Sequence, residues 1–437
     1  MSAQRIALVC MTPTADANEH GAMELPSYGV RRILAALLAD PALKGVQTAL
    51  IEAERPDVDA YVEAIERFEP DLVGMSIYVW STPCLVEVAR RLKQRRPNRP
   101  IVFGGPSARP ALFDLAPYAP ARRYLDAIVS TEGEEVFREI ARLPEFSRAA
   151  FESVSGLDLP AAAGWWRTGP RAALADLDAI ASPYQLGVMQ PDSVAYLETY
   201  RGCPFSCAFC EWGSSNKSKA VFSADYIARE LEAYGRHRAP AVFLVDAGLN
   251  LNPRAFRNLR EAESRIGFLK SAAFWAEIYP SLLREEHLEF LKSVRTGYLG
   301  IGLQSTDPEV LKGLERPFDE RKLETVVRQV SDLVNAELQI IFGLPGDSPA
   351  GFRRTLETAR SLPVNVRAYG CLVLPDALMT RSRPEWQVRY DPLSLRLSSC
   401  LGWSEHDIRE MRAWITEAAR AAGGKAGEYW WFFPRRR

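Results

Sequence analysis

Short apolar runs alternate with amphipathic segments of helical length through the first 145 residues of the chain. Such runs are typical of parallel strands covered on both faces, and we expect five of them, at Ile6–Cys10, Gln47–Ile51, Leu72–Ile77, Ile101–Phe103 and Ala127–Val129. Segments of helical period lie between them, at Val30–Leu38, Val58–Phe68, Leu85–Arg95 and Glu134–Leu143. This order predicts an α/β domain over residues 1–145, with a doubly wound parallel sheet whose ligands bind at the strand carboxyl ends.

The same alternation resumes after residue 192. Six more strands are expected, at Val194–Thr199, Ala241–Val245, Ala272–Ile278, Tyr298–Gly302, Leu338–Phe342 and Val366–Leu372. Six strand–helix units are fewer than the eight of a complete barrel, so residues 193–380 predict an open, partial (β/α)6 barrel with its active face at the strand carboxyl ends. Residues 146–192 are rich in Ala, Pro, Gly and Asp, and we interpret them as a connector with one or two short helices.

The last segment, residues 381–437, is interpreted as a helical tail. It includes the run Trp430–Phe433, whose four aromatic side chains cannot all lie on one face of a helix or strand. We expect this run to pack into a groove, and a contact in a dimer is the second interpretation.

Charge and hydropathy argue against several classes of protein. Lys and Arg number 54 and Asp and Glu 55, a balance unlike the basic surface of a general nucleic-acid binder. No run reaches the roughly 18 apolar residues of a membrane span, and the N-terminal run is too short for a signal peptide. We therefore expect a cytoplasmic protein that binds neither nucleic acid nor membrane, and whose seven cysteines are thiols or metal ligands.

Three cysteines follow the first strand of the second domain, in the segment Arg201–Gly213 (RGCPFSCAFCEWG). Cys203, Cys207 and Cys210 have the spacing C-x3-C-x2-C, and three thiolates on one short loop can bind three corners of a [4Fe–4S] cluster. The fourth iron is then open, which is the mark of a reactive metal site. The alternative is a zinc site. Zinc prefers paired ligands, and the available fourth ligands, none of them in a pair, are His237, Cys371 and Cys400.

The segment Leu197–Cys210 (LETYRGCPFSCAFC) resembles the cluster motif of the radical S-adenosylmethionine (radical SAM) superfamily. The resemblance implies a [4Fe–4S] cluster whose unique iron binds the amino and carboxylate groups of S-adenosylmethionine. It also implies reductive cleavage of that cofactor to a 5′-deoxyadenosyl radical, with an electron from a donor such as flavodoxin or ferredoxin.

Later segments resemble other parts of the same superfamily, in the order of its barrel strands: FLVDAGLN, GIGLQS, IFGLPGD and LVLP. The resemblance implies that Phe209 lies near the adenine. It assigns contacts with S-adenosylmethionine to eight further residues: Asp246, Asn250, Glu277, Gln304, Ser305, Arg316, Gly343 and Gly346. Two alternatives stand beside these roles. Glu277 or Arg316 can instead form an ion pair at the barrel rim, and Asp246 and Asn250 can cap the next helix.

An α/β domain before a radical SAM barrel resembles the cobalamin-binding domain of cobalamin-dependent radical SAM enzymes. The residues that carry this resemblance follow the expected strands: Ser76, Tyr78, Trp80, Gly104, Gly105, Pro106, Glu132, Gly133 and Glu134. The resemblance implies that the lower cobalt face meets residues 78–81, with Trp80 shielding it. The alternatives are strand–helix turns without a ligand and an ordinary core position for Trp80. The cobalt-ligating motif D-x-H-x-x-G is absent, and the one histidine of this domain, His20, is expected in a loop.

This domain order implies an enzyme that methylates an unactivated carbon of a small-molecule, natural-product type of substrate, using a 5′-deoxyadenosyl radical and methylcobalamin. The first alternative is a radical SAM enzyme that catalyses a cyclisation, rearrangement or epimerisation, with or without cobalamin. The second is a non-catalytic Fe–S or zinc protein. No catalytic side chain beyond the cofactor contacts is assigned.

Overall fold

The computed structural model describes residues 4–12, 26–215 and 220–436. The chain divides into two compact units, and each is built around its own sheet. The first unit contains residues 1–193 together with 392–394, and the second contains residues 194–391 and 395–437.

Within its described residues, the first unit contains a seven-stranded sheet with the order β2-β1-β3-β4-β5-β6-β7. Its first five strands run parallel: β1 Arg5–Met11, β2 Gln47–Ala53, β3 Leu72–Ser76, β4 Ile101–Gly104 and β5 Ala127–Val129. The chain reverses its direction of winding between β1 and β3, and doubly wound sheets bind ligands at such a switch point, beyond the strand carboxyl ends. The predicted doubly wound parallel sheet is confirmed.

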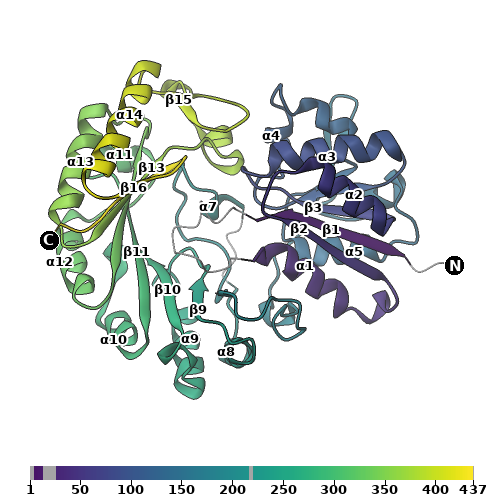
Figure 1. The fold of residues 1–437 in the computed structure, drawn as a ribbon, viewed down its shortest axis with the longest axis horizontal. Helices are drawn as coiled ribbons and strands as arrows, with labels where there is room; N and C mark the ends of the chain where they lie inside the picture. Colours follow the sequence, from purple (N-terminus) through teal and green to yellow (C-terminus); the bar gives the residue numbers. More distant parts are fainter. Residues whose placement is uncertain (1–3, 13–25, 216–219, 437) are drawn as a thin grey trace. The chain divides into compact units, whose positions relative to one another are not determined.

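Helices cover both faces of this sheet (Figure 1). They are α1 Tyr28–Leu38, α2 Val58–Phe68, α3 Thr82–Arg95 and α5 Gly133–Ala141, with the short α4 Pro110–Phe113 and α6 Arg148–Glu152. In Figure 1, α1 and α5 lie on one side of β1 and β3, and α2 and α3 lie side by side on the other. Because both faces are covered, β1 is buried from Ile6 to Met11. Each aliphatic side chain buried in this way contributes about 1.5–3 kcal/mol, which explains why these strands are apolar throughout.

The segment interpreted as a connector differs from that expectation. The strands β6 (Leu157–Ala161) and β7 (Gly164–Arg167) form a hairpin that extends the first sheet antiparallel to β5. Gly164 has a φ of 96°, a left-handed conformation that glycine adopts without strain and that closes the tight turn of the hairpin. In a segment rich in Ala, Pro and Gly, the buried side chains of β6 are too few to predict a strand from periodicity.

Within its described residues, the second unit contains an eight-stranded sheet with the order β16-β17-β13-β12-β11-β10-β9-β8. Six strands follow one another in parallel: β8 Ala195–Leu197, β9 Ala241–Leu244, β10 Ala273–Ile278, β11 Thr296–Gln304, β12 Ala336–Phe342 and β13 Asn365–Gly370. The predicted partial (β/α)6 barrel is confirmed. Parallel strands place all their carboxyl ends at one rim, so residues distant in the chain meet there.

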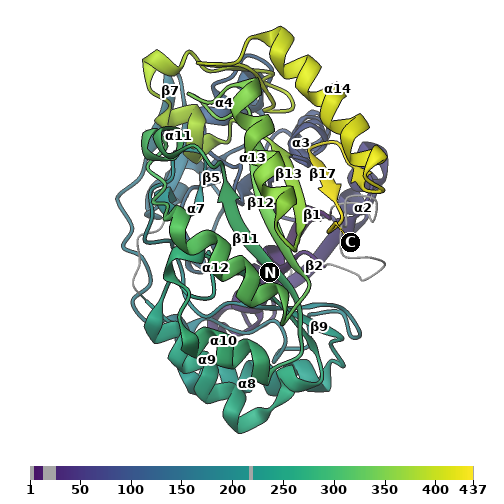
Figure 2. The same ribbon diagram turned by 90° about the vertical axis from the view of Figure 1, so that its left-hand side faces the viewer.

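Helices form the outer layer of this barrel, and Figure 2 shows α12 and α13 beside β11, β12 and β13. The helices of the second unit are α7 Trp212–Ser215, α8 Ala224–Arg236, α9 Pro253–Ile266, α10 Glu285–Ser293, α11 Pro308–Gly313, α12 Glu320–Ser331, α13 Pro349–Ser361 and α14 Glu405–Ala421. Strands β11 and β12 alternate between residues that face these helices, such as Leu299 and Leu338, and residues that face the barrel interior, such as Gln339.

The C-terminal segment is helical only in part, which corrects the interpretation of a helical tail. After α14, the run Trp430–Phe433 forms β17, which pairs antiparallel with β13 (Figure 2). Trp431 and Phe433 are buried on one face of the strand. The rings of Trp430 and Phe432, on the other face, contact the guanidinium of Arg367. A strand separates neighbouring side chains onto opposite faces, so four consecutive aromatic residues serve two surfaces. The remaining strands are β14 Arg389–Tyr390, β15 Leu397–Ser399 and β16 Lys425–Ala426.

Candidate active site

The three cysteines lie on one loop that begins after β8, at the carboxyl rim of the barrel. Cys207 is buried, Cys203 and Cys210 are half-buried, and all three are free thiols. The loop turns back on itself, since the Cys210 amide donates to the Cys207 carbonyl at 3.0 Å. Gly213 ends the loop, and a Cβ there would lie 1.8 Å from the Phe205 carbonyl oxygen, so only glycine fits. The loop is therefore a tightly folded unit.

Burial of the loop favours the neutral thiol form of two of its cysteines. Burial raises the pKa of Cys203, and it raises the pKa of Cys210 to about 11. Backbone hydrogen bonds from Phe205 to Cys203 and from Trp212 to Cys210 act in the opposite direction, as does the charge of Arg316. The thiols that carry these raised pKa values are protonated near neutral pH, so metal binding must release protons.

The donor set fits an iron–sulfur cluster. Three thiols share one loop, and backbone groups are positioned to hydrogen-bond the sulfurs, which is a recognised influence on cluster properties. Among the residues that the structure describes, no three His, Cys, Asp or Glu side chains are grouped as ligands of a single metal ion. A cubic cluster binds its cysteines through different iron atoms, so their sulfurs need not converge on one point.

Arg316 lies beside the cysteine loop. Its Nη1 is 3.9 Å from the Cys207 sulfur, and its Nη2 donates to the carbonyl of Gly302 in β11. Its guanidinium stacks on the ring of Tyr279, with 5.0 Å between the guanidinium carbon and the ring centre. A Cβ at Gly302 would lie 2.9 Å from Nη2, so this glycine makes room for the arginine. Arg316 thus contacts the cysteine loop, the backbone of β11 and the ring of Tyr279.

Asp246 and Asn250 follow β9, and both bind backbone groups of neighbouring segments. The Asp246 carboxylate accepts from the Thr199 amide at 2.8 Å and contacts the Thr199 hydroxyl. Asn250 exchanges two hydrogen bonds with the backbone of Tyr279, at 2.8 and 2.9 Å. Neither caps a helix, because the N-cap of α9 is Asn252. These two side chains thus fasten the ends of β8 and β10 to the segment after β9.

The burial of Asp246 leads to a testable pH dependence. Burial is the largest influence, and it raises the pKa of this carboxyl to about 8, although the Thr199 bonds act against it. An acid whose pKa is higher in the folded state stabilises that state below its unfolded pKa and loses this contribution as the pH rises. Between pH 5.5 and 7.5, we expect a loss of about 1.4 kcal/mol per pH unit. Melting temperatures across this range should fall for the wild type more steeply than for Asp246→Asn, and parallel curves would contradict the assignment.

Glu277, Gln304 and Ser305 stand at the carboxyl ends of β10 and β11. Glu277 accepts a hydrogen bond from Gln339 Nε2 at 2.9 Å, and its carboxylate occupies the space that a Cβ at Gly300 would fill. Gln304 has a left-handed φ of 72°, and the Ser305 hydroxyl is buried and accepts from the Asp307 amide. These residues form one rim with the cysteine loop, as the parallel topology requires.

The turn after β12 contains the two predicted glycines. Gly343 has a φ of 86° and Gly346 a φ of 89°, a conformation that strains any other residue. A Cβ at Gly343 would lie 2.9 Å from the Leu397 side chain, whereas no atom lies within 4 Å of that position at Gly346. Backbone at Gly346 is therefore open to close approach by a ligand. Phe209, the aromatic residue before the last cysteine, is half-buried.

One residue in contact with the cysteine loop, Arg381, was missed by the sequence reasoning. Arg381 donates from Nη1 to the Ser206 carbonyl at 3.1 Å, and from Nη2 to the carbonyls of Cys207, at 2.9 Å, and Cys210. The two segments are more than 170 residues apart, and no motif surrounds this arginine in the sequence. Only the barrel fold brings them together.

In the first unit, the predicted cobalamin contacts lie at the ends of β3, β4 and β5. Ser76 ends β3 and pairs in register with Gly104, which ends β4. Gly105 has a φ of 95°, and a Cβ there would lie 2.8 Å from the Ile77 carbonyl oxygen. This turn therefore requires glycine and presents bare backbone, and Pro106 beside it is exposed. A cradle of this kind fits a bulky ligand that approaches backbone closely.

Tyr78 and Trp80 follow β3 and stack on each other, with ring centres 4.5 Å apart and planes at 18°. Trp80 is 41% exposed and donates from Nε1 to the carbonyl of Met11 at the end of β1. It is not a core residue, which corrects the alternative given above. The pair stands between β1 and β3, at the switch point of the sheet, where a flat ligand would meet an aromatic face.

Glu132, Gly133 and Glu134, the last three residues predicted to contact cobalamin, lie at the start of α5. Glu132 is its N-cap and accepts from the Leu174 amide at 2.8 Å. A Cβ at Gly133 would lie 2.9 Å from the Ile33 side chain, so this glycine allows α1 and α5 to pack closely. Glu134 is buried in the first turn. His20 lies outside the described residues.

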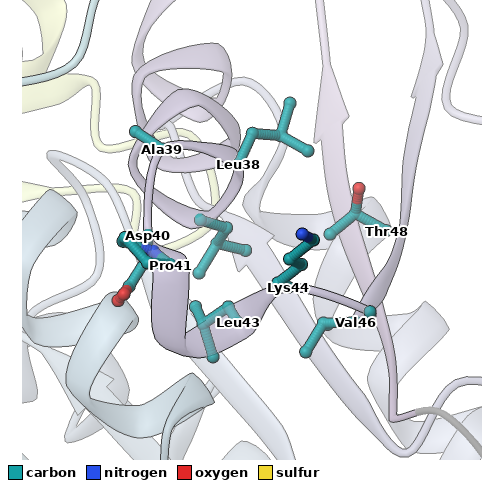
Figure 3. A pocket seen from close by; sticks show the side chains of 10 residues that line it. Leu38, Ala39, Asp40, Pro41, Leu43, Lys44, Val46 and Thr48 are labelled. Carbon is teal, nitrogen blue, oxygen red and sulfur yellow. The ribbon is translucent and has the colours of Figure 1, made fainter.

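A cavity of about 330 Å³ opens elsewhere in the first unit. Its lining lies between the end of α1 and the start of β2 (Figure 3), and comprises Leu37, Leu38, Ala39, Asp40, Pro41, Leu43, Lys44, Gly45, Val46 and Thr48. These residues surround the amino end of β2, so none belongs to the predicted cofactor sites, which follow strand carboxyl ends. In the part of the chain that is described, no helix is both long and apolar enough to cross a membrane.

Comparisons with known families agree with this division of the chain. Residues 19–141 match the family model of the B12 binding domain, and residues 197–359 match that of the radical SAM superfamily. The fold and the cysteine loop agree with these matches, and the chain carries a B12 binding domain ahead of a radical SAM domain.

Two curated relatives are similar to most of the chain. The chain is 31% identical over 348 residues to the 2-(S-pantetheinyl)-carbapenam-3-carboxylate methyltransferase of Streptantibioticus cattleyicolor, and 29% identical over 339 residues to the cobalamin-dependent radical SAM methyltransferase TokK of Streptomyces tokunonensis. Each match covers 71% of this chain and 48% of the relative. The chain therefore spans about half the length of these relatives.

A solved structure shares the fold over a greater length. The radical SAM methyltransferase TsrM from Kitasatospora setae, with tryptophan substrate and a SAM analogue bound, superposes with a TM-score of 0.69. The match covers 94% of this chain and 89% of TsrM, at 16% sequence identity. At this identity the likeness concerns the fold.

Proposed function

We propose that this chain is a cobalamin-dependent radical SAM enzyme that methylates an unactivated carbon of a small-molecule substrate. The observation that carries the proposal is the loop with Cys203, Cys207 and Cys210 at the carboxyl rim of a partial barrel, in a chain that also has a B12 binding domain. The two curated relatives are methyltransferases, and the substrate named for one of them is a carbapenam. This favours a substrate of natural-product type.

In this proposal, the barrel residues hold the cluster and S-adenosylmethionine. The three cysteines bind the cluster, which when loaded supplies the electron that cleaves S-adenosylmethionine to a 5′-deoxyadenosyl radical. Arg316 stands beside Cys207 and is suited to the carboxylate of S-adenosylmethionine. The open backbone at Gly346 lets the adenine approach, next to Phe209.

The other barrel residues have two kinds of role in the proposal. Glu277, Gln304 and Ser305 border the site of the ribose and the amino acid moiety. Asp246 and Asn250, whose polar atoms bind backbone, shape the rim by fixing the ends of β8 and β10. In this position they act on the cofactor through the strands that they join.

The first unit holds cobalamin in the proposal, at the ends of β3, β4 and β5. Gly104 and Gly105 provide bare backbone beside Ser76 for the nucleotide tail, with Pro106 next to them. Residues 132–134 border this site at the start of α5. Trp80, stacked on Tyr78, would offer bound cobalamin an aromatic surface. We further propose a flavodoxin or ferredoxin as electron donor and the cytoplasm as the compartment.

Anaerobic reconstitution tests the proposal. The chain is incubated with iron, sulfide and hydroxocobalamin, desalted, and analysed for metals, and we expect about four iron and one cobalt per chain. Reduction in the presence of S-adenosylmethionine labelled with deuterium in its methyl group should release 5′-deoxyadenosine and leave the label on cobalamin. Iron without cobalt would contradict the cobalamin assignment, and zinc in place of iron would contradict the enzyme assignment altogether.

A further inference from the structure

The segment that follows β13 is folded against the cysteine loop. It forms an irregular turn at Pro375–Met379, kinked at Asp376 and Ala377, and the Thr380 hydroxyl donates to the Pro375 carbonyl at 2.8 Å. The next residue, Arg381, donates from Nε to the Asp376 carbonyl at 2.9 Å. The backbone of this segment therefore sets the direction of the Arg381 side chain.

The Arg381 guanidinium reaches three carbonyls of the cysteine loop, those of Ser206, Cys207 and Cys210. A guanidinium is planar and has five N–H donors in a rigid fork, so it can hold several acceptors at fixed spacing. Here the acceptors include the carbonyls of two of the three cysteines. The fork therefore fixes the relative position of Cys207 and Cys210 before any metal is bound.

Two further contacts hold the same loop. The Asp376 amide donates to the carboxylate of Glu211, the residue after Cys210, at 3.2 Å. The Ala208 amide donates to the Leu314 carbonyl at 2.9 Å. The peptide group between Cys207 and Ala208 is thus held at both ends, by Arg381 at its oxygen and by Leu314 at its nitrogen.

Arg381 also brings a permanent positive charge to the loop. A guanidinium stays protonated at all accessible pH values, and this one is half-buried, where charges are screened less than in bulk water. A cluster gains one negative charge when it is reduced. A fixed positive charge nearby stabilises the reduced form and raises the reduction potential, since net charge and hydrogen bonding set that potential.

We propose that Arg381 is a positioning residue of the cluster, which presets the cysteine loop through three carbonyls and raises the reduction potential of the bound cluster through its charge. The proposal rests on the proposed function, in that it takes the loop to bind a [4Fe–4S] cluster. Its two parts are separable by substitution, because lysine retains the charge and loses the fork, whereas methionine loses both.

The test compares Arg381→Lys and Arg381→Met with the wild type and with Arg328→Met. Arg328 is an exposed residue of α12 that pairs with Glu324, so its loss controls for a change of net charge. Each full-length protein is reconstituted anaerobically with iron and sulfide. The rate of iron loss to a chelator and the midpoint potential of the cluster, followed by electron paramagnetic resonance, are then measured.

We expect both Arg381 variants to lose iron about tenfold faster than the wild type, because both lack the fork. The midpoint potential of Arg381→Met should fall by about 59 mV, which is a tenfold change in the equilibrium of a one-electron couple. The potential of Arg381→Lys should stay near that of the wild type, as should both quantities in Arg328→Met.

The outcomes separate this proposal from the proposed function. A wild-type protein that takes up no iron contradicts the proposed function. A wild type that binds the cluster, together with an Arg381→Met variant of unchanged potential and unchanged iron loss, contradicts the role of Arg381. If Arg381→Met does not fold, Arg381→Lys decides alone: wild-type iron retention in this variant overturns the positioning role, and a lowered potential overturns the charge role.

Discussion

Replacing Cys203 and Cys207 together by alanine is expected to abolish iron binding and reductive cleavage of S-adenosylmethionine while leaving cobalamin binding intact. Two of the three thiolates on the loop are then lost, and one remaining cysteine cannot hold a cubic cluster. The predicted cobalamin contacts are in the first unit, whose sheet and core are separate from the barrel. Iron per chain should fall from about four to near zero, with cobalt unchanged after desalting.

A matched control uses the buried cysteines of the same unit. Cys371 and Cys400 lie after β13 and β15 and were the cysteines available as fourth ligands of a zinc site. The variant with both replaced by alanine should retain full iron content. If this control loses metal as the loop variant does, or if the loop variant retains iron, the three-cysteine assignment is wrong.

Replacing Arg367 by methionine is expected to lower the free energy of unfolding of the barrel by about 3–5 kcal/mol, the usual cost of breaking a buried ion pair. Arg367 in β13 and Glu337 in β12 form two parallel hydrogen bonds, at 2.8 and 2.9 Å, and both side chains are about 5% exposed or less. The Tyr298 hydroxyl donates to the same carboxylate at 2.9 Å. Removal of the guanidinium leaves a buried carboxylate without its counter-charge.

The double variant Glu337→Leu, Arg367→Met distinguishes charge burial from lost packing. If the cost arises from the uncompensated carboxylate, the double variant should regain most of the stability lost by Arg367→Met, since two apolar side chains leave no buried charge. Urea denaturation of the full chain, followed by circular dichroism, measures both. A double variant at least as unstable as Arg367→Met would instead attribute the cost to lost packing against Trp430 and Phe432 in β17.

Most of the fold could be predicted because its signals are local. Apolar runs and helical periods are read within single segments, and the strands expected at Gln47–Ile51 and Ala127–Val129 begin at the observed residues. The cysteine loop is also local, since its ligands span Cys203 to Cys210. Strands that are stabilised mainly by pairing with segments distant in the sequence were not predicted. The β6–β7 hairpin has a weak sequence pattern, and it forms because β6 pairs with the edge strand β5. In the same way, β17 forms because it pairs with β13.

For the polar residues of the site, the sequence predicted the location, and the structure showed the contacts. Arg316 was expected at the site and lies beside Cys207, but the structure shows that it also binds the Gly302 carbonyl and stacks on Tyr279. Asp246 and Asn250 were expected as ligand contacts or helix caps, and their polar atoms bind the backbone of neighbouring strands. A carboxylate or amide in a sequence shows what it can bind, and only its neighbours in space show what it does bind.

The amino-acid sequence by itself determined that this protein has two α/β units, that the second is a partial barrel, and that three cysteines follow its first strand. These properties depend on the order and spacing of residues along the chain. Only the tertiary structure decided that Arg381 holds the cysteine loop and that Trp80 stands exposed at the switch point of the first sheet. Parallel strands bring their carboxyl ends to one rim, so segments far apart in the chain become neighbours, and no local pattern encodes which of them touch.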